Sequence, residues 1–134
     1  MKKLLYLFVA VAFVSLTILS FTTRFQDNEW VVPESAKKMI NPTDADDENM
    51  AYGKSLYAKH CKSCHGKEGL GDGSKAEELE TYAGDFSTDL SDQTDGALFY
   101  KITEGRDEMP NFDKKLADDE DRWILVHYMR TFSE

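Results

Sequence analysis

Hydrophobic residues follow two different patterns along this chain: an unbroken run at the N-terminus and helical stripes in the second half. The run extends from Leu4 to Phe21 without a charged residue and follows Lys2 and Lys3. A basic start before an apolar run is typical of an export signal, and this run is also long enough to cross a bilayer. We therefore expect residues 1–22 to be a cleaved export signal or, alternatively, an uncleaved membrane anchor.

Three segments after residue 46 place apolar residues at helical spacing, each behind a residue suited to capping a helix. The predicted helices span about Glu48–Lys62, Asp95–Glu104 and Asp118–Ser133. Thr94 is positioned to cap the start of the second helix and Gly105 to close its end. No stretch alternates apolar and polar residues for long enough to indicate a sheet. We expect residues 46–134 to form a small all-α domain of three to five helices with loops.

Residues 23–45 contain Pro33 and Pro42 and are predicted to be a linker between the N-terminal segment and the helical domain.

The net charge and the cysteine count exclude several classes of protein. The chain has 25 acidic against 16 basic residues and a net charge of −9, which disfavours a nucleic-acid-binding protein. Its two cysteines, Cys61 and Cys64, are too few for a disulfide framework, a four-cysteine zinc site or an iron–sulfur cluster.

The candidate chemistry lies in the sequence Cys61-Lys62-Ser63-Cys64-His65. Cys-x-x-Cys-His is the attachment motif of c-type haem. Two thiols three residues apart on a helical turn point to the same side, where they can bond the two vinyl groups of one haem edge, and His65 can then reach the iron. The porphyrin would also supply apolar mass to a thin core. We expect one covalent haem c, held by Cys61, Cys64 and His65.

The motif has three alternatives to haem attachment. A thioredoxin-like pair would need a preceding strand in a βαβ unit, which the pattern lacks. A zinc site made of Cys61, Cys64 and either His60 or His65 would still lack a fourth ligand. A chance occurrence of the five residues is the third alternative. The export segment favours haem, because c-type haem is attached outside the cytoplasm.

The second iron ligand separates an electron carrier from a haem protein with an open site, which would bind a gas or react with peroxide. Met109 lies in a polar loop between two predicted helices, where a methionine has no packing reason to occur, and Pro110 would stiffen this loop. Met129 falls on the apolar stripe of the last helix and is better explained as core, and His127 as a helix-surface residue. We expect Met109 to complete a His/Met pair, with no catalytic residue.

At this point the chain resembles the class I cytochromes c, the monohaem His/Met family, over about residues 46–134. The resemblance rests on these motifs: Gly53-x-x-x-Tyr57, Cys61-x-x-Cys64-His65-Gly66, Gly69-x-Gly71-Asp72-Gly73, Gly105-Arg106 through Met109-Pro110, and Arg122-Trp123 through Met129-Arg130. It implies that the first and last helices cross at Gly53, with Tyr57, Leu125 and Tyr128 packed around the crossing. The family's proline after the haem histidine is absent, so a carbonyl between Tyr82 and Gly84 is expected to accept the hydrogen bond from His65.

The resemblance implies an exported carrier of single electrons in the periplasm or at the outer face of the inner membrane. Its redox partners would be a terminal oxidase, a quinol-oxidising complex or a dehydrogenase, and it would be a monomer. A fixed subunit of a larger respiratory complex is the alternative if residues 4–21 act as a membrane tether. Five lysines near the motif or after Met109 are candidates for docking an acidic partner: Lys59, Lys62, Lys67, Lys114 and Lys115.

Overall fold

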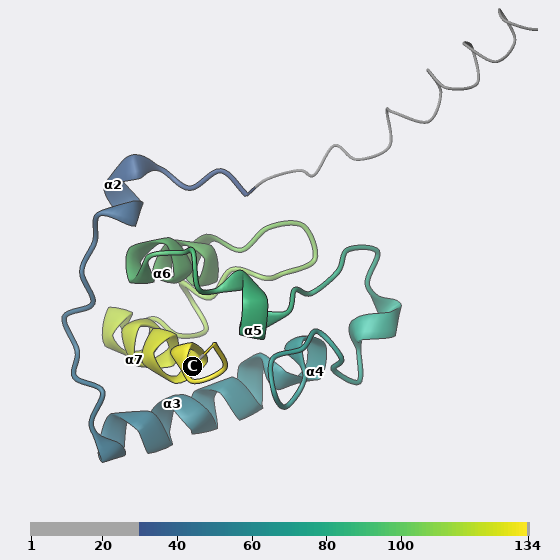
Figure 1. Ribbon diagram of the computed structural model, residues 1–134, viewed down its shortest axis with the longest axis horizontal. Helices are drawn as coiled ribbons and strands as arrows, with labels where there is room; N and C mark the ends of the chain where they lie inside the picture. Colours follow the sequence, from purple (N-terminus) through teal and green to yellow (C-terminus); the bar gives the residue numbers. More distant parts are fainter. Residues whose placement is uncertain (1–29, 134) are drawn as a thin grey trace, which may run out of the picture. The chain divides into compact units, whose positions relative to one another are not determined.

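The computed structural model describes residues 30–133, and within them the chain from Val32 onward forms one folded unit of helices joined by loops (Figure 1). No β-strand occurs in this part of the chain, which confirms the all-α prediction. The helices are α2 (Glu34–Lys37), α3 (Asp47–His60), α4 (Lys62–His65), η1 (Ala76–Glu78), α5 (Phe86–Asp89), α6 (Asp95–Glu104) and α7 (Asp119–Arg130), of which η1 is a 3₁₀ turn.

The predicted helices are present, with two differences at their ends. Helix α6 has the predicted bounds, capped by the Thr94 side chain and closed by Gly105 at φ 64°. Helix α3 ends at His60 rather than near Lys62, because the backbone at Cys61 departs from helical geometry (φ −116°) and a separate turn, α4, follows. Helix α7 ends at Arg130 rather than Ser133, since the next amides bond three residues back, as in a tightened last turn.

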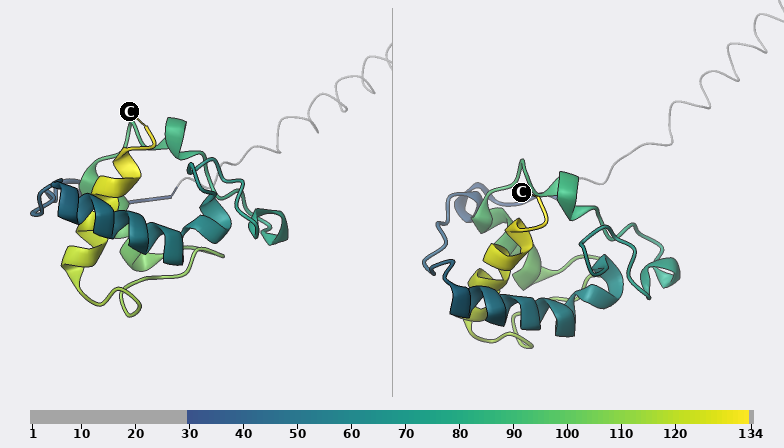
Figure 2. Two further views of the ribbon diagram at one scale, coloured as in Figure 1. Left: turned by 90° about the horizontal axis from the view of Figure 1, so that it is seen from below. Right: turned by 60° about the horizontal axis from the view of Figure 1, so that its bottom comes forward.

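Helices α3 and α7 cross at Gly53, as the resemblance implied (Figure 2). A Cβ atom at Gly53 would lie 2.9 Å from the Ile124 carbonyl oxygen and 2.9 Å from the Cβ of Tyr128. Tyr57 packs beside this contact, with its ring centre 5.5 Å from that of Tyr128. The glycine therefore sets how closely the two helices approach.

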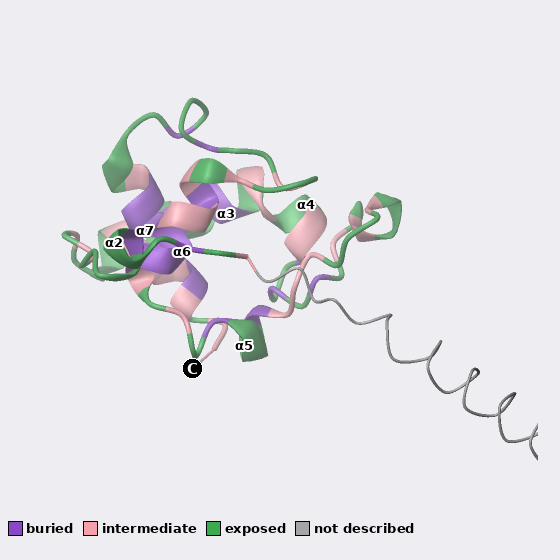
Figure 3. Cartoon of the chain, turned by 90° about the horizontal axis from the view of Figure 1, so that it is seen from above, coloured by how far each residue is buried: buried purple, intermediate pink, exposed green. Residues whose placement is uncertain are grey.

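Helices α6 and α7 contribute the largest share of the core and are buried along much of their length in Figure 3, and Leu56 and Tyr57 of α3 also belong to it. Met129, which the sequence predicts on the apolar stripe of the last helix, is buried, as is Leu125, and Phe132 is half-buried against the same cluster. The rings of Phe99 and Trp123 stack with centres 4.0 Å apart and join the two helices. Met129 is thus a core residue, as the pattern indicated.

The segment before α3 packs on the domain. Val32 and Ala36 are buried, and α2 lies against α6 at Gly96, whose missing side chain leaves room for the Ala36 carbonyl. The Asn41 side chain donates to the Trp123 carbonyl (3.0 Å). The described part of the predicted 23–45 linker is therefore ordered on the surface of α6 and α7.

The predicted export segment, residues 1–22, lies outside the described residues. None of the helices within residues 30–133 combines the length and apolar character that a membrane span requires.

Candidate functional site

The Cys-x-x-Cys-His motif forms the junction between α3 and the single turn α4. The amides of Cys64 and His65 both donate to the Cys61 carbonyl, at 3.1 and 3.0 Å. This turn holds both cysteines and the histidine within one short helical segment, and neither cysteine is in a disulfide. The motif follows a helix directly, which is unlike the strand that a thioredoxin-like pair requires.

A glycine-rich loop, residues 66–75, folds back onto the motif. Three successive carbonyls of α4 each accept a hydrogen bond from it: Ser63 from the Lys75 amide (2.8 Å), Cys64 from Gly73 (3.2 Å) and His65 from Gly71 (2.9 Å). A Cβ atom at Gly73 would lie 2.6 Å from the carbonyl carbon of Ser63, so a side chain there would displace the motif. The loop thus satisfies the free carbonyls at the end of α4 and fixes its position.

Tyr57 secures the same turn from α3. Its hydroxyl donates to the Gly66 carbonyl at 2.8 Å, in a buried contact. Burial raises the pKa of the Tyr57 hydroxyl well above its ordinary value of 10.0. The neutral, donating form is therefore retained in the folded protein at pH values where an exposed tyrosine ionises.

We expect Tyr57→Phe to lower the free energy of unfolding at pH 7 by about 1 kcal/mol, because the Gly66 carbonyl loses its buried donor. Above pH 10.0 the unfolded chain releases the Tyr57 proton while the folded protein keeps it, so this residue's contribution to stability falls as the pH rises. The wild type should then lose stability more steeply than the variant, by up to about 1.4 kcal/mol per pH unit. Urea unfolding at pH 7 and above pH 10 measures both effects.

Tyr82→Phe is the matched control, because the exposed Tyr82 hydroxyl also donates to a carbonyl, that of Leu70 (3.1 Å). This variant should have nearly the same free energy of unfolding as the wild type at both pH values. Equal slopes in the wild type and Tyr57→Phe would contradict the expectation.

His65 lies against Phe86, with the ring centres 4.6 Å apart and nearly parallel. Its Nδ1 atom is buried and makes no hydrogen bond of normal geometry. Burial lowers the pKa of His65, and the nearby Ala83 carbonyl partly opposes this shift. Ala83 lies within the range Tyr82 to Gly84 from which the sequence predicts the acceptor, and the bond itself stays a prediction.

Cys61 contacts the main hydrophobic core, and burial, with a smaller contribution from Cys64, raises the pKa of its thiol to about 12. The group is therefore a protonated thiol at neutral pH.

Met109 sits in a tight turn between α6 and α7. The Arg106 amide donates to the Met109 carbonyl and the Met109 amide to the Arg106 carbonyl, both at 2.9 Å. Asp107 within this turn has φ 53°, in the left-handed region. The Met109 side chain is half-buried and packs on the same core as Cys61. The turn therefore holds the thioether against the apolar cluster on which the motif also packs.

A contact that the sequence did not indicate joins the Met109 turn to the loop beside His65. Glu108 accepts hydrogen bonds from the Thr81 amide (2.9 Å) and the Thr81 hydroxyl (3.0 Å). Neither residue lies on a periodic element, so no pattern in the sequence points to their pairing. His127, the weaker ligand candidate, instead makes a 2.9 Å hydrogen bond between Nε2 and the Thr43 carbonyl.

The donor set fits haem c. Two free thiols and a half-buried imidazole lie in one segment, a half-buried thioether packs on the same core as Cys61, and the buried Nδ1 of His65 still lacks a hydrogen-bond partner. Residues 30–133 contain no group of three or more His, Cys, Asp and Glu side chains placed to hold a metal ion.

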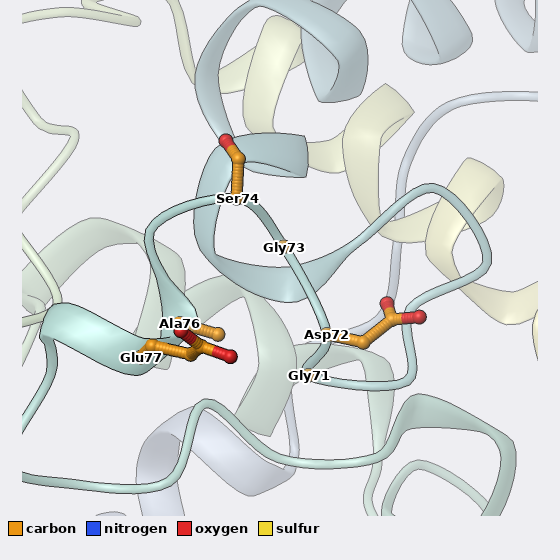
Figure 4. A pocket seen from close by; sticks show the side chains of 6 residues that line it. All are labelled: Gly71, Asp72, Gly73, Ser74, Ala76 and Glu77. Carbon is orange, nitrogen blue, oxygen red and sulfur yellow. The ribbon is translucent and has the colours of Figure 1, made fainter.

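The glycine-rich loop also borders an open hollow that has Asp72 and Glu77 at its edge (Figure 4). No residue of the Cys-x-x-Cys-His motif lines this hollow.

Comparisons with known proteins agree with this geometry. Residues 48–129 match the family described as cytochrome C oxidase, cbb3-type, subunit III. No curated protein matches the chain. Among solved structures, a chain of the reducing HAO-like protein complex of Kuenenia stuttgartiensis is similar, with 29% sequence identity and a TM-score of 0.61 over 82% of this chain and 53% of that chain. The present chain thus spans about half the length of that relative.

The family match covers more than half of the chain and includes the whole Cys-x-x-Cys-His segment, the Met109 turn and most of α7. The chain therefore belongs to the cytochrome c family of cbb3-type oxidase subunit III and is a c-type cytochrome with haem c as its cofactor.

Proposed function

We propose that this protein is an exported carrier of single electrons, with thioethers from Cys61 and Cys64 and with His65 and Met109 as the iron ligands. The observation that supports it most is the joint placement of the motif and the Met109 turn: Cys61 and Met109 pack on one core, and His65 stacks on Phe86 of that core.

The side chains of the motif are suited to the proposed thioether bonds and to the bond between His65 and the iron. Each thiol would add across one vinyl group, sulfur to one carbon and its proton to the other, without an oxidant. Burial lowers the pKa of His65 and so favours its neutral form, whose Nε2 would bind the iron if Nδ1 donates to a backbone carbonyl such as that of Ala83. Bound haem c supplies a one-electron Fe(III)/Fe(II) couple, and a methionine thioether favours the reduced form more than a second histidine does.

Mass spectrometry of protein matured in a host that attaches c-type haem tests the covalent part. The wild type should gain the mass of one haem, and the Cys61→Ser/Cys64→Ser double variant should not retain haem after denaturation. Haem that stays bound to the double variant under denaturing conditions would contradict the assignment of the thioethers.

Part of the candidate lysine set gathers beside the motif. Burial lowers the pKa of His60, and so do Lys59 and Lys115, which places both amines near this ring. Lys115 Nζ lies 5.5 Å from the centre of the Phe112 ring, and the His60 ring packs edge-on against the same ring. We propose that Lys59 and Lys115 form a local basic patch that attracts an acidic partner. Lys67 is paired with Glu68 at 3.1 Å and is not included.

We expect Lys59→Glu/Lys115→Glu to slow reduction of the ferric protein by ferrocyanide, an anionic probe, by about tenfold at low ionic strength, because both changes repel the approaching anion. The difference should shrink with added salt, since the Debye length falls to about 3 Å at 1 M. Lys54→Glu, an exposed position on α3, is the control for net charge. An equal effect of Lys54→Glu per charge changed would contradict a local patch.

A fixed subunit of a respiratory complex is the second candidate. Two findings favour it: the family is named for an oxidase subunit, and the similar solved chain belongs to a protein complex. Sequencing the N-terminus of the mature protein distinguishes a mobile carrier from a fixed subunit. Removal of residues 1–22 supports a mobile carrier, and a retained segment in the membrane fraction supports a tethered subunit.

A further inference from the structure

The contact between Glu108 and Thr81 is a side-chain bridge between the Met109 turn and the loop that precedes Ala83. One carboxylate oxygen of Glu108, Oε2, accepts hydrogen bonds from both the amide and the hydroxyl of Thr81. The two residues are 27 positions apart in the sequence. Two donors on one oxygen define the position of the carboxylate better than a single bond would. The bridge therefore holds two loops that share no secondary structure.

Each end of this bridge is adjacent to a proposed iron ligand or its support. Glu108 directly precedes Met109, whose backbone is closed into the turn with Arg106 by two hydrogen bonds. Thr81 lies two residues before Ala83, whose carbonyl lies beside the His65 ring. A displacement of the Met109 turn away from the domain would have to break the bridge.

The Thr81 side of the bridge is itself anchored. The Tyr82 hydroxyl donates to the Leu70 carbonyl at 3.1 Å, and the Phe86 amide donates to the Gly69 carbonyl at 2.8 Å. These bonds attach the loop to the glycine-rich segment that folds over the motif.

We propose that Glu108 is a positioning residue for Met109: by holding Thr81, its carboxylate keeps the methionine turn closed and disfavours release of the thioether. This inference rests on the proposed function, because it assumes that Met109 binds the iron. Glu108 is not one of the proposed iron ligands, and its effect passes through the backbone of the next residue.

Binding of imidazole to the ferric holoprotein measures the release of Met109, because the external ligand can bind only where the thioether has left. We expect Glu108→Ala to tighten the apparent affinity for imidazole about threefold, which is the size of effect an exposed charged contact has. Thr81→Val removes the hydroxyl donor and should tighten it in the same direction. Thr81→Ser keeps the donor and should bind imidazole as the wild type does.

Glu104→Ala is the matched control, because Glu104 is an exposed glutamate at the end of α6, close to the same turn. It should leave the imidazole affinity unchanged. Equal affinities in Glu108→Ala and Glu104→Ala would overturn the inference, as would a loss of thermal stability in Glu108→Ala with no change in imidazole binding. A failure of the proposed ligation looks different: the wild type itself would then lack the methionine-to-ferric charge-transfer band.

Discussion

Replacing Met109 with alanine should lower the reduction potential on the order of 0.1 V, within the range of about 0.8 V that axial ligands control. The thioether favours ferrous iron, and its removal leaves either water or an open position in its place. Carbon monoxide should then bind the reduced variant and shift its visible spectrum. The methionine-to-ferric charge-transfer band should disappear from the oxidised variant.

Met129→Leu is the control for this prediction, because Met129 is buried in the core on α7 and leucine has a similar volume. Its potential and its charge-transfer band should be unchanged. Retention of the band in Met109→Ala, or its loss in Met129→Leu, would show that the ligand is not Met109.

Replacing Gly53 with valine should lower the free energy of unfolding by about 3 kcal/mol. A Cβ atom alone would come within 2.9 Å of the Ile124 carbonyl and of the Tyr128 Cβ, and neither is the end of a flexible side chain. Helices α3 and α7 would therefore have to move apart, which opens the contact that supports Tyr57 and the motif. Denaturant unfolding of the haem-containing protein measures the loss.

Ala51→Val provides the control for helix propensity, because Ala51 is exposed on the same helix two residues earlier. It should cost about 0.5 kcal/mol. A loss of similar size in both variants would mean that the helix crossing at Gly53 is not close-packed.

The parts of the fold that could be predicted are those with local signals. The bounds of α6 follow from Thr94 and Gly105, and the Gly53 contact follows from the resemblance. The predicted end of α3 is two residues late, because Cys61 continues the apolar spacing although its backbone leaves the helix. The one-turn helices α2, α4 and α5 are too short to show a period.

The residues of the candidate site likewise fall into those that the sequence identifies and those that it does not. The motif is contiguous, so its residues can be identified from the sequence, and Met109 stands out as an apolar residue in a polar loop. Thr81 and Glu108 come from irregular loops that meet only in three dimensions, and no sequence pattern links them. The burial of Arg122, with its guanidinium over the Phe99 ring and bonded to the Leu116 carbonyl and Asp119, has no sequence signal either.

The most direct test of the account is the visible spectrum of the holoprotein, recorded oxidised, reduced, and reduced under carbon monoxide. His65/Met109 ligation predicts a low-spin spectrum with the methionine-to-ferric charge-transfer band and no change on adding carbon monoxide. A high-spin spectrum that shifts with carbon monoxide would mean an open iron site, and it would contradict the proposed ligation.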